Sequence, residues 1–206
     1  MRKILFIAAI LLIGVIFWLS LGEDQPAKFT YGVSFSRFHS EELGLDWKET
    51  YLAILEDLKV KNFRFSAHWP LTEPEEGKFN FEELDFQIKE AQKVGASVIL
   101  TVGRRLPGWP ECHEPEWAKD LNKAEKQEKI LKYIETVVGR YKNYDNVKYW
   151  QVENEPFLGF FSRSICGELD EEFLKKEIAL VKELDQSRPI IITDSGEFGT
   201  WYKAYQ

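Results

Sequence analysis

The sequence is poor in the residues from which metal-bound and disulfide-built domains are made. Its 206 residues include two cysteines and three histidines. So few cysteines exclude a zinc-finger array or a disulfide scaffold, and the scattered histidines lack ligand spacing. We therefore expect no metal and no cofactor. Basic residues are also in deficit, 27 against 34 acidic ones, and a net charge of −7 disfavours a nucleic-acid partner.

Residues 4–21 contain no charged side chain and follow Arg2 and Lys3. Eighteen helical residues span about 27 Å, close to the thickness of a bilayer's hydrocarbon core. We expect residues 1–22 to be a membrane anchor, with a cleaved signal peptide as the alternative, and residues 23–28 to be a linker. In either case we expect residues 23–206 to lie outside the cytoplasm, anchored to the membrane or secreted.

Strand-like and helix-like segments alternate from residue 29 onward, without a visible repeat. The apolar runs and alternation predict strands at residues 29–35, 62–68, 97–102, 147–153 and 189–193. Helical periodicity and capping residues predict helices at residues 47–58, 125–141 and 171–184, and one that begins near residue 80 and stops at Gly95. Repeated strand–helix units indicate an α/β fold with a parallel sheet.

Two features favour a (β/α)8 TIM barrel over a doubly wound sheet. The first strand–helix turn, residues 34–39, lacks a glycine-rich phosphate loop. Polar and aromatic residues instead follow several different strands, as they do where a barrel builds a site at one rim. Aromatic residues, at 15% of the chain, suit stacking on sugar rings as well as core packing.

Two motifs carry a family resemblance. Trp150-Gln151-Val152-Glu153-Asn154-Glu155-Pro156 ends the fourth predicted strand, where buried unpaired carboxylates and amides would be costly. The second comprises Phe63-Arg64-Phe65-Ser66, Trp69-Pro70 and Glu73-Pro74 through Leu84-Asp85. Both stand at strand positions that resemble the retaining glycoside hydrolases of clan A, which are (β/α)8 barrels. The resemblance covers about residues 29–200 and does not select one family within the clan.

The resemblance implies a catalytic residue and several ligands of a sugar. Glu155 would be the acid/base, which protonates the leaving oxygen and then activates water. Asn154 would bond the sugar's 2-hydroxyl, and Arg64 would orient the nucleophilic carboxylate, unless it is tied into a structural ion pair. His68 shares the polar side of its strand with Arg64.

The loops after the third and fifth strands add further candidates. Leu106-Pro107-Gly108-Trp109 looks like a loop in which clan families carry substrate-contacting aromatics, so Trp109 and His113 are predicted to contact sugar; ordinary packing of Trp109 is equally compatible. Glu197 is predicted to bind sugar or to have a structural role rather than to act as nucleophile. Cys112 and Cys166 lie in neighbouring loops and either form a disulfide or remain free thiols.

The clan's nucleophile stands at the end of the seventh strand, and this chain supplies five strands. We therefore expect residues 29–206 to be part of a longer glycosidase that acts on a β-linked oligo- or polysaccharide. A non-catalytic carbohydrate-binding barrel and an unrelated barrel with chance motifs remain alternatives. The motif around Glu155 resembles both the β-galactosidase families and the cellulase, xylanase and β-xylosidase families, so the sugar stays open.

Overall fold

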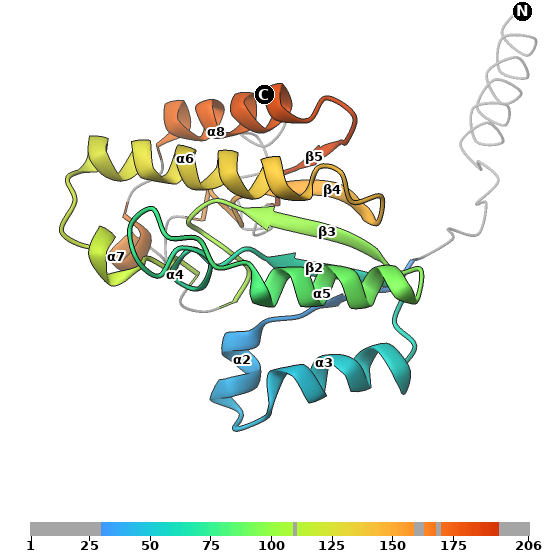
Figure 1. Ribbon diagram of the computed structural model, residues 1–206. Helices are drawn as coiled ribbons and strands as arrows, with labels where there is room; N and C mark the ends of the chain where they lie inside the picture. Colours follow the sequence, from blue (N-terminus) through green and yellow to red (C-terminus); the bar gives the residue numbers. More distant parts are fainter. Residues whose placement is uncertain (1–29, 109–110, 159–162, 168–169, 194–206) are drawn as a thin grey trace, which may run out of the picture. The chain divides into compact units, whose positions relative to one another are not determined.

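The computed structural model describes residues 30–108, 111–158, 163–167 and 170–193. The residues from Gly32 onward form one compact unit. Its five strands are all parallel and follow one another in the sheet in chain order, as Figure 1 shows: β1 (Val33–Ser34), β2 (Asn62–Ser66), β3 (Ser97–Val102), β4 (Val147–Val152) and β5 (Ile190–Ile191). The α/β fold with a parallel sheet is confirmed.

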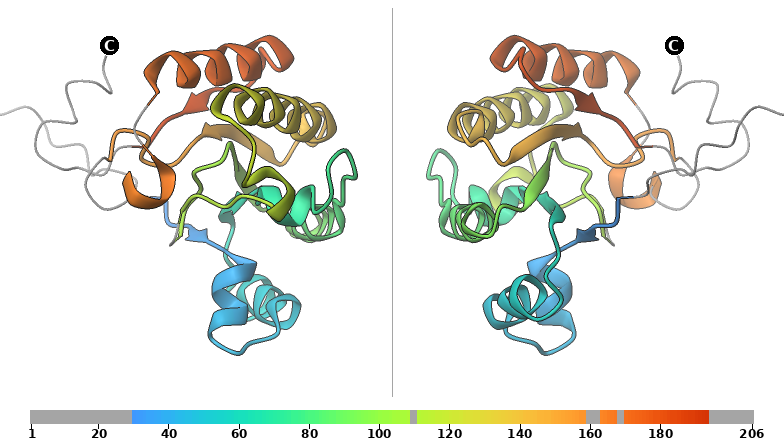
Figure 2. Two further views of the ribbon diagram at one scale, coloured as in Figure 1. Left: turned by 90° about the vertical axis from the view of Figure 1, so that its left-hand side faces the viewer. Right: turned by 90° about the vertical axis from the view of Figure 1, so that its right-hand side faces the viewer.

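The strand order also separates a barrel from a doubly wound sheet. Crossovers between parallel strands are right-handed, so an order that never reverses sends every connecting helix to the same face of the sheet. The four long helices do lie along one face (Figure 2): α3 (Trp47–Glu56), α5 (Glu82–Lys93), α6 (Lys123–Tyr141) and α8 (Glu171–Leu184). This is the winding of a (β/α) barrel, of which the described residues form five strands.

The core lies between the helices and the sheet. Phe63 and Phe65 leave β2 on the helix side and meet the ring of Tyr51 from α3 at centroid distances of 5.5 and 5.6 Å. On α5, the expected apolar face is buried through Leu84 and Ile88. Alternate residues of the strands are thereby fixed toward the helices, which leaves the side chains between them for the opposite face.

Caps define where the helices begin. Asp46 accepts a hydrogen bond from the backbone N–H of Glu49 at 2.9 Å, as the sequence predicts. The helix predicted at 125–141 begins earlier, at Lys123, because Asn122 and Glu125 form a capping box. Gly95, with a φ of +68°, follows α5 and ends it as expected.

The predicted edge strands are too long. Strand β1 covers two of the residues predicted at 29–35, and β5 covers two of those predicted at 189–193. Each lies at an edge of the described sheet and pairs on one side only, β1 with β2 and β5 with β4, so an apolar run alone does not extend the ladder. Strand β3, paired on both sides, has the predicted bounds.

Short helices lie at the carboxyl ends of the strands, where the sequence predicts strand or loop. They are α2 (Arg37–Glu42), α4 (Trp69–Thr72), the 3-10 turn η1 (Glu116–Ala118) and α7 (Arg163–Cys166). Strand β2 stops at Ser66 rather than residue 68, because Pro70 favours the first turn of α4 and His68 becomes its N-cap.

No helix in the described residues combines the length and the apolar character needed to cross a bilayer. The anchor predicted at residues 4–21 lies outside the described residues.

Candidate active site

The turn that follows β4 is built from Glu153, Asn154 and Glu155. The φ angles of Glu153 and Glu155 are +57° and +46°, the left-handed region that residues with a Cβ occupy at an energetic cost. These two angles break the alternation of the strand, so the three successive side chains leave the backbone in directions that a regular strand would not allow. Strain of this kind concentrates at functional sites.

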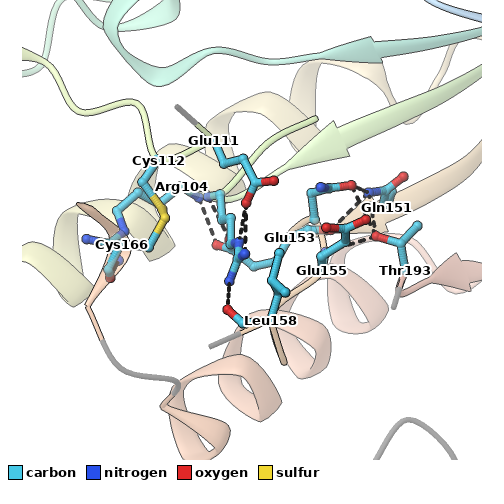
Figure 3. Close-up of polar contacts among 11 residues, drawn as sticks. Arg104, Glu111, Cys112, Gln151, Glu153, Glu155, Leu158, Cys166 and Thr193 are labelled. Carbon is cyan, nitrogen blue, oxygen red and sulfur yellow. Dashed lines mark hydrogen bonds and ion pairs between the residues drawn. A yellow bond between two sulfur atoms is a disulfide. The ribbon is translucent and has the colours of Figure 1, made fainter. Parts of the chain in front are cut away.

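Asn154 and Glu155 belong to a hydrogen-bonded network, drawn in Figure 3. The Oδ1 atom of Asn154 accepts hydrogen bonds from Nε2 of Gln151 and from the hydroxyl of Thr193, both at 3.2 Å. The Thr193 hydroxyl also accepts the backbone N–H of Glu155 at 3.0 Å. The Asn154 amide is therefore held in one orientation, with its nitrogen turned away from these two donors.

Arg64 reaches the same network from β2. Its Nε donates to Oγ of Ser34 at 2.8 Å, and its Nη1 donates to Oε1 of Gln151 at 3.4 Å. Burial lowers the pKa of Arg64, and the nearby charge of Glu155 opposes that shift. The guanidinium thus lies within the electrostatic reach of the predicted acid/base, on the side of the sheet that the long helices leave uncovered.

His68 and His113 form an aromatic cluster with Phe38. The ring of Phe38 stacks on His113 at 5.0 Å and meets the edge of His68 at 4.7 Å; the two histidine rings are 5.0 Å apart. Burial, then the charges of His113 and Arg37, lowers the pKa of His68 to about 3, so its ring is neutral at pH 7. Both of its ring nitrogens are buried without a hydrogen-bond partner among the described residues.

The loop after β3 is fixed by two arginines whose functions the sequence does not predict. Arg105 donates to Oε2 of Glu111 at 2.8 Å and to the carbonyl of Leu158 at 2.9 Å (Figure 3). Arg104 donates to Oε1 of Glu114 at 2.6 Å and to the carbonyl of Cys166. These contacts tie the loop after β3 to the segment after β4.

Cys112 and Cys166 make the same connection covalently. The structure joins them in a disulfide, one of the two states that the sequence leaves open. Their Cα atoms lie 5.4 Å apart, within the usual range for a disulfide. The loops that follow β3 and β4 are therefore cross-linked beside the predicted acid/base.

The structure brings together Glu155, Asn154 and Arg64, and separately His68 and His113. Trp109 and Glu197 lie outside the described residues. Sequence reasoning missed Ser34 and Thr193 and gave no individual role to Gln151, which it quoted in the motif. All three join the network, and the signal was their place at the carboxyl ends of β1, β5 and β4, where parallel strands present their site residues.

A cavity of about 510 Å³ opens on the helix side of the same rim. It lies between the first turns of α6 and α8, and Arg104, Lys126, Asp170 and Glu177 line it together with apolar residues. Glu155 is not among its lining residues. In the described part of the chain, no three histidine, cysteine, aspartate or glutamate side chains gather as metal ligands.

The family model for glycosyl hydrolase family 10 matches residues 34–177, which include both motifs and the whole of the network except Thr193. The chain belongs to this family. Membership confirms the clan A resemblance and places the chain in a family of glycosidases. It favours the glycosidase reading over the non-catalytic carbohydrate-binding barrel.

Curated relatives agree with the family. The chain is 29% identical over 175 residues to endo-1,4-beta-xylanase 3 of Hypocrea jecorina, covering 82% of this chain and 47% of the relative. It is 30% identical over 126 residues to beta-galactosidase Pbg of Clostridium perfringens, covering 53% of this chain and 18% of the relative. The chain thus spans about half the length of the xylanase that it matches.

Solved structures show the same fold. A GH5_18 protein from Streptomyces cattleya superposes with a TM-score of 0.62 at 15% identity, over 79% of this chain and 44% of that one. Xylanase 10B from Thermotoga maritima superposes with a TM-score of 0.56 at 20% identity, over 79% and 49%. At these identities the likeness shows the barrel fold alone.

Proposed function

We propose that the protein containing this chain hydrolyses a β-linked polysaccharide of the xylan type with retention of configuration, and that Glu155 is its acid/base. The observation that carries the proposal is the fixed Asn154–Glu155 turn at the end of β4, in a chain of glycosyl hydrolase family 10. The xylanases among its relatives support xylan over a galactoside, because the xylanase of Hypocrea jecorina aligns over more of the chain than the β-galactosidase.

Each residue of the network would have a defined task. Glu155 would protonate the leaving oxygen and later take a proton from water. Asn154, whose Oδ1 is already held by Gln151 and Thr193, would donate from its nitrogen to the sugar's 2-hydroxyl oxygen. Arg64 would orient the nucleophile, a carboxylate that must lie about 5–5.5 Å from Glu155 in a retaining enzyme.

The test is the substitution Glu155→Ala in the whole protein, with xylan as substrate. We expect a loss of kcat of at least about 100-fold, the contribution of a positioned acid/base. Glu172→Ala, on an exposed residue of α8 paired with Lys175, is the matched control and should leave activity unchanged. Xylan hydrolysis that survives Glu155→Ala would refute the assignment, and NMR of the first product's anomer decides between retention and inversion.

We also propose that the barrel residues lie outside the cytoplasm, held by residues 4–21 or secreted after cleavage. The apolar run supports this, as does the Cys112–Cys166 disulfide, because disulfides persist in oxidising compartments. An alkaline phosphatase fused after residue 206 should be active only if it is exported, and N-terminal sequencing of the mature protein distinguishes an anchor from a cleaved signal. An inactive fusion would contradict export.

A further inference from the structure

Glu153 points away from the predicted active site and holds the loop after β3. Its Oε1 accepts the backbone N–H of Arg104 at 2.8 Å, and its Oε2 accepts that of Arg105 at 2.6 Å. Gly103 makes room for this contact: its φ is +113°, and a Cβ there would lie 2.4 Å from Oε1 of Glu153. Two adjacent backbone donors thus bind both oxygens of one carboxylate.

Glu177, from α8, meets Glu153 on the helix side of the sheet. Its side chain hydrogen-bonds that of Glu153, and only 1% of its surface is exposed. Two carboxylates can share a hydrogen bond only if one of them is protonated. Burial raises the pKa of Glu153 too, but the two N–H groups that it accepts and the charge of Arg104 favour its ionised form, so Glu177 carries the proton.

The surroundings favour the same state. Burial, then the adjacent charge of Glu153, raises the pKa of Glu177 well above its usual range. The charge of Asp170, the N-cap of α8, acts in the same direction, and that of Arg104 opposes it. The phenol of Tyr133 on α6 donates to the carbonyl of Ala67 and stays neutral, because burial and then the nearby charge of Glu153 raise its pKa.

We propose that Glu153 and Glu177 form a positioning pair that shares one proton and sets the orientation of Asn154 and Glu155. The inference rests on the proposed function, since Glu155 is the group being positioned. The pair offsets the energetic cost of the left-handed φ of Glu153. That φ angle sets the direction of the chain at the next residue, Asn154. The backbone carbonyl of Glu153 accepts a hydrogen bond from Nε2 of Gln151 at 3.0 Å, the same atom that donates to Oδ1 of Asn154, so the pair acts on the network through the backbone of Glu153.

The shared proton has a direct test in the 206-residue chain, independent of activity. Infrared difference spectra between the wild type and Glu177→Gln at pH 7 should show the carbonyl stretch of one protonated carboxylic acid in the wild type only. Glu172→Gln, on the exposed face of the same helix, should leave that band in place. A difference spectrum without this band, or loss of the same band in Glu172→Gln, would overturn the shared proton.

The positioning function is tested by kinetics on xylan in the whole protein. Glu177→Leu removes the donor, and we expect kcat to fall by about 10- to 100-fold with KM little changed, the effect of misplacing a catalytic group. Glu177→Gln keeps a donor to Glu153 and should restore most of kcat. Equal losses in both variants, or no loss in Glu177→Leu, would overturn positioning.

The two proposals can fail separately. Near-ultraviolet circular dichroism shows whether Glu177→Leu retains the wild-type fold. If it does not, Glu177→Gln decides. Wild-type kcat in Glu177→Gln supports positioning, and a loss of kcat that Glu172→Gln does not share opposes it. If the wild-type protein cleaves no xylan, the proposed function fails, and the infrared comparison still decides whether the pair exists.

Discussion

The two ends of the sheet treat their buried polar groups differently. At the amino ends of β4 and β5, Arg188 donates to three backbone carbonyls and one carboxylate, those of Val147, Lys142, Tyr144 and Asp185. At the carboxyl ends, both ring nitrogens of His68 and one oxygen of Glu177 are buried without a partner among the described residues. Glu153 and Glu155 are strained there as well.

Asp185 completes the cluster at the amino ends. Burial raises its pKa, but hydrogen bonds from Ser187, Trp150 and Arg188 outweigh that effect and hold the pKa well below its usual range. At the amino ends the charges of Arg188 and Asp185 are thus met by hydrogen bonds, and among the described residues there the Oδ1 of Asn146 is buried without a partner; at the carboxyl ends two imidazole nitrogens and a carboxyl oxygen lack one. The contrast matches the division of a barrel into a stabilising and a functional face.

The sharpest way to break this contrast is Arg188→Ala. The substitution removes the cationic partner of Asp185 and the donor to three carbonyls, and we expect the free energy of unfolding to fall by about 3–5 kcal/mol, as when one partner of a buried pair is removed. Urea unfolding measures it. Lys175→Ala, which breaks only the exposed pair with Glu172, should change stability by less than about 1 kcal/mol. Similar losses of unfolding free energy in Arg188→Ala and Lys175→Ala would show that the hydrogen bonds of Arg188 contribute no more to stability than an exposed ion pair.

The second prediction concerns the cross-link at the carboxyl ends. Replacing both Cys112 and Cys166 by serine should lower the free energy of unfolding by about 2–4 kcal/mol, because the bridge restrains the unfolded chain. Reduction of the wild type with dithiothreitol should give the same shift in urea midpoint. If neither the reductant nor the double substitution moves the midpoint, the disulfide contributes nothing to stability.

The smallest expected change is a gain in stability rather than a loss. His68→Phe removes two unmet ring nitrogens from the carboxyl ends and should raise the free energy of unfolding at pH 7 by about 1–2 kcal/mol. His39→Phe is the control, because His39 is exposed and pairs with Glu42. Urea unfolding should show no gain there, and a loss of stability in His68→Phe would mean that the imidazole is well matched to its surroundings.

The same variant has a defined pH dependence. The folded-state pKa of His68 is about 3, below the value of about 6.5 in an unfolded chain, so protonation favours unfolding. The wild type's stability from this group is complete above pH 6.5 and is lost as the pH falls toward 3. The advantage of His68→Phe in unfolding free energy should therefore grow between pH 7 and pH 5.

Periodicity predicted the bounds of a central strand and of a long amphipathic helix. Strand Ser97–Val102 and helix Glu171–Leu184 have the bounds that their apolar patterns indicate. The edge strands and the six-residue α2 were not predicted well, because a ladder needs a partner on the neighbouring strand and a short helix depends on a single cap, Ser36. Local pattern carries neither piece of information.

The candidate site was predicted in part. Two motifs pointed to Asn154, Glu155 and Arg64, which the structure places in and around one network. The sequence did not distinguish the tasks of Glu153 and Glu155, two carboxylates separated by one residue. A regular strand would place both on the same face, and only the positive φ angles show that Glu153 points toward α8 instead.

The side chain of Glu153 points toward α8, and Glu155 follows only two residues later along the chain. Under the proposed function, a change in the packing of α8 would reach Glu155 through the two peptide bonds that join it to Glu153. Substitutions around Glu177 on the helix layer would then adjust the angle at which Glu155 meets its leaving group. The helix layer outside β4 would in that case influence the reaction as well as support the fold.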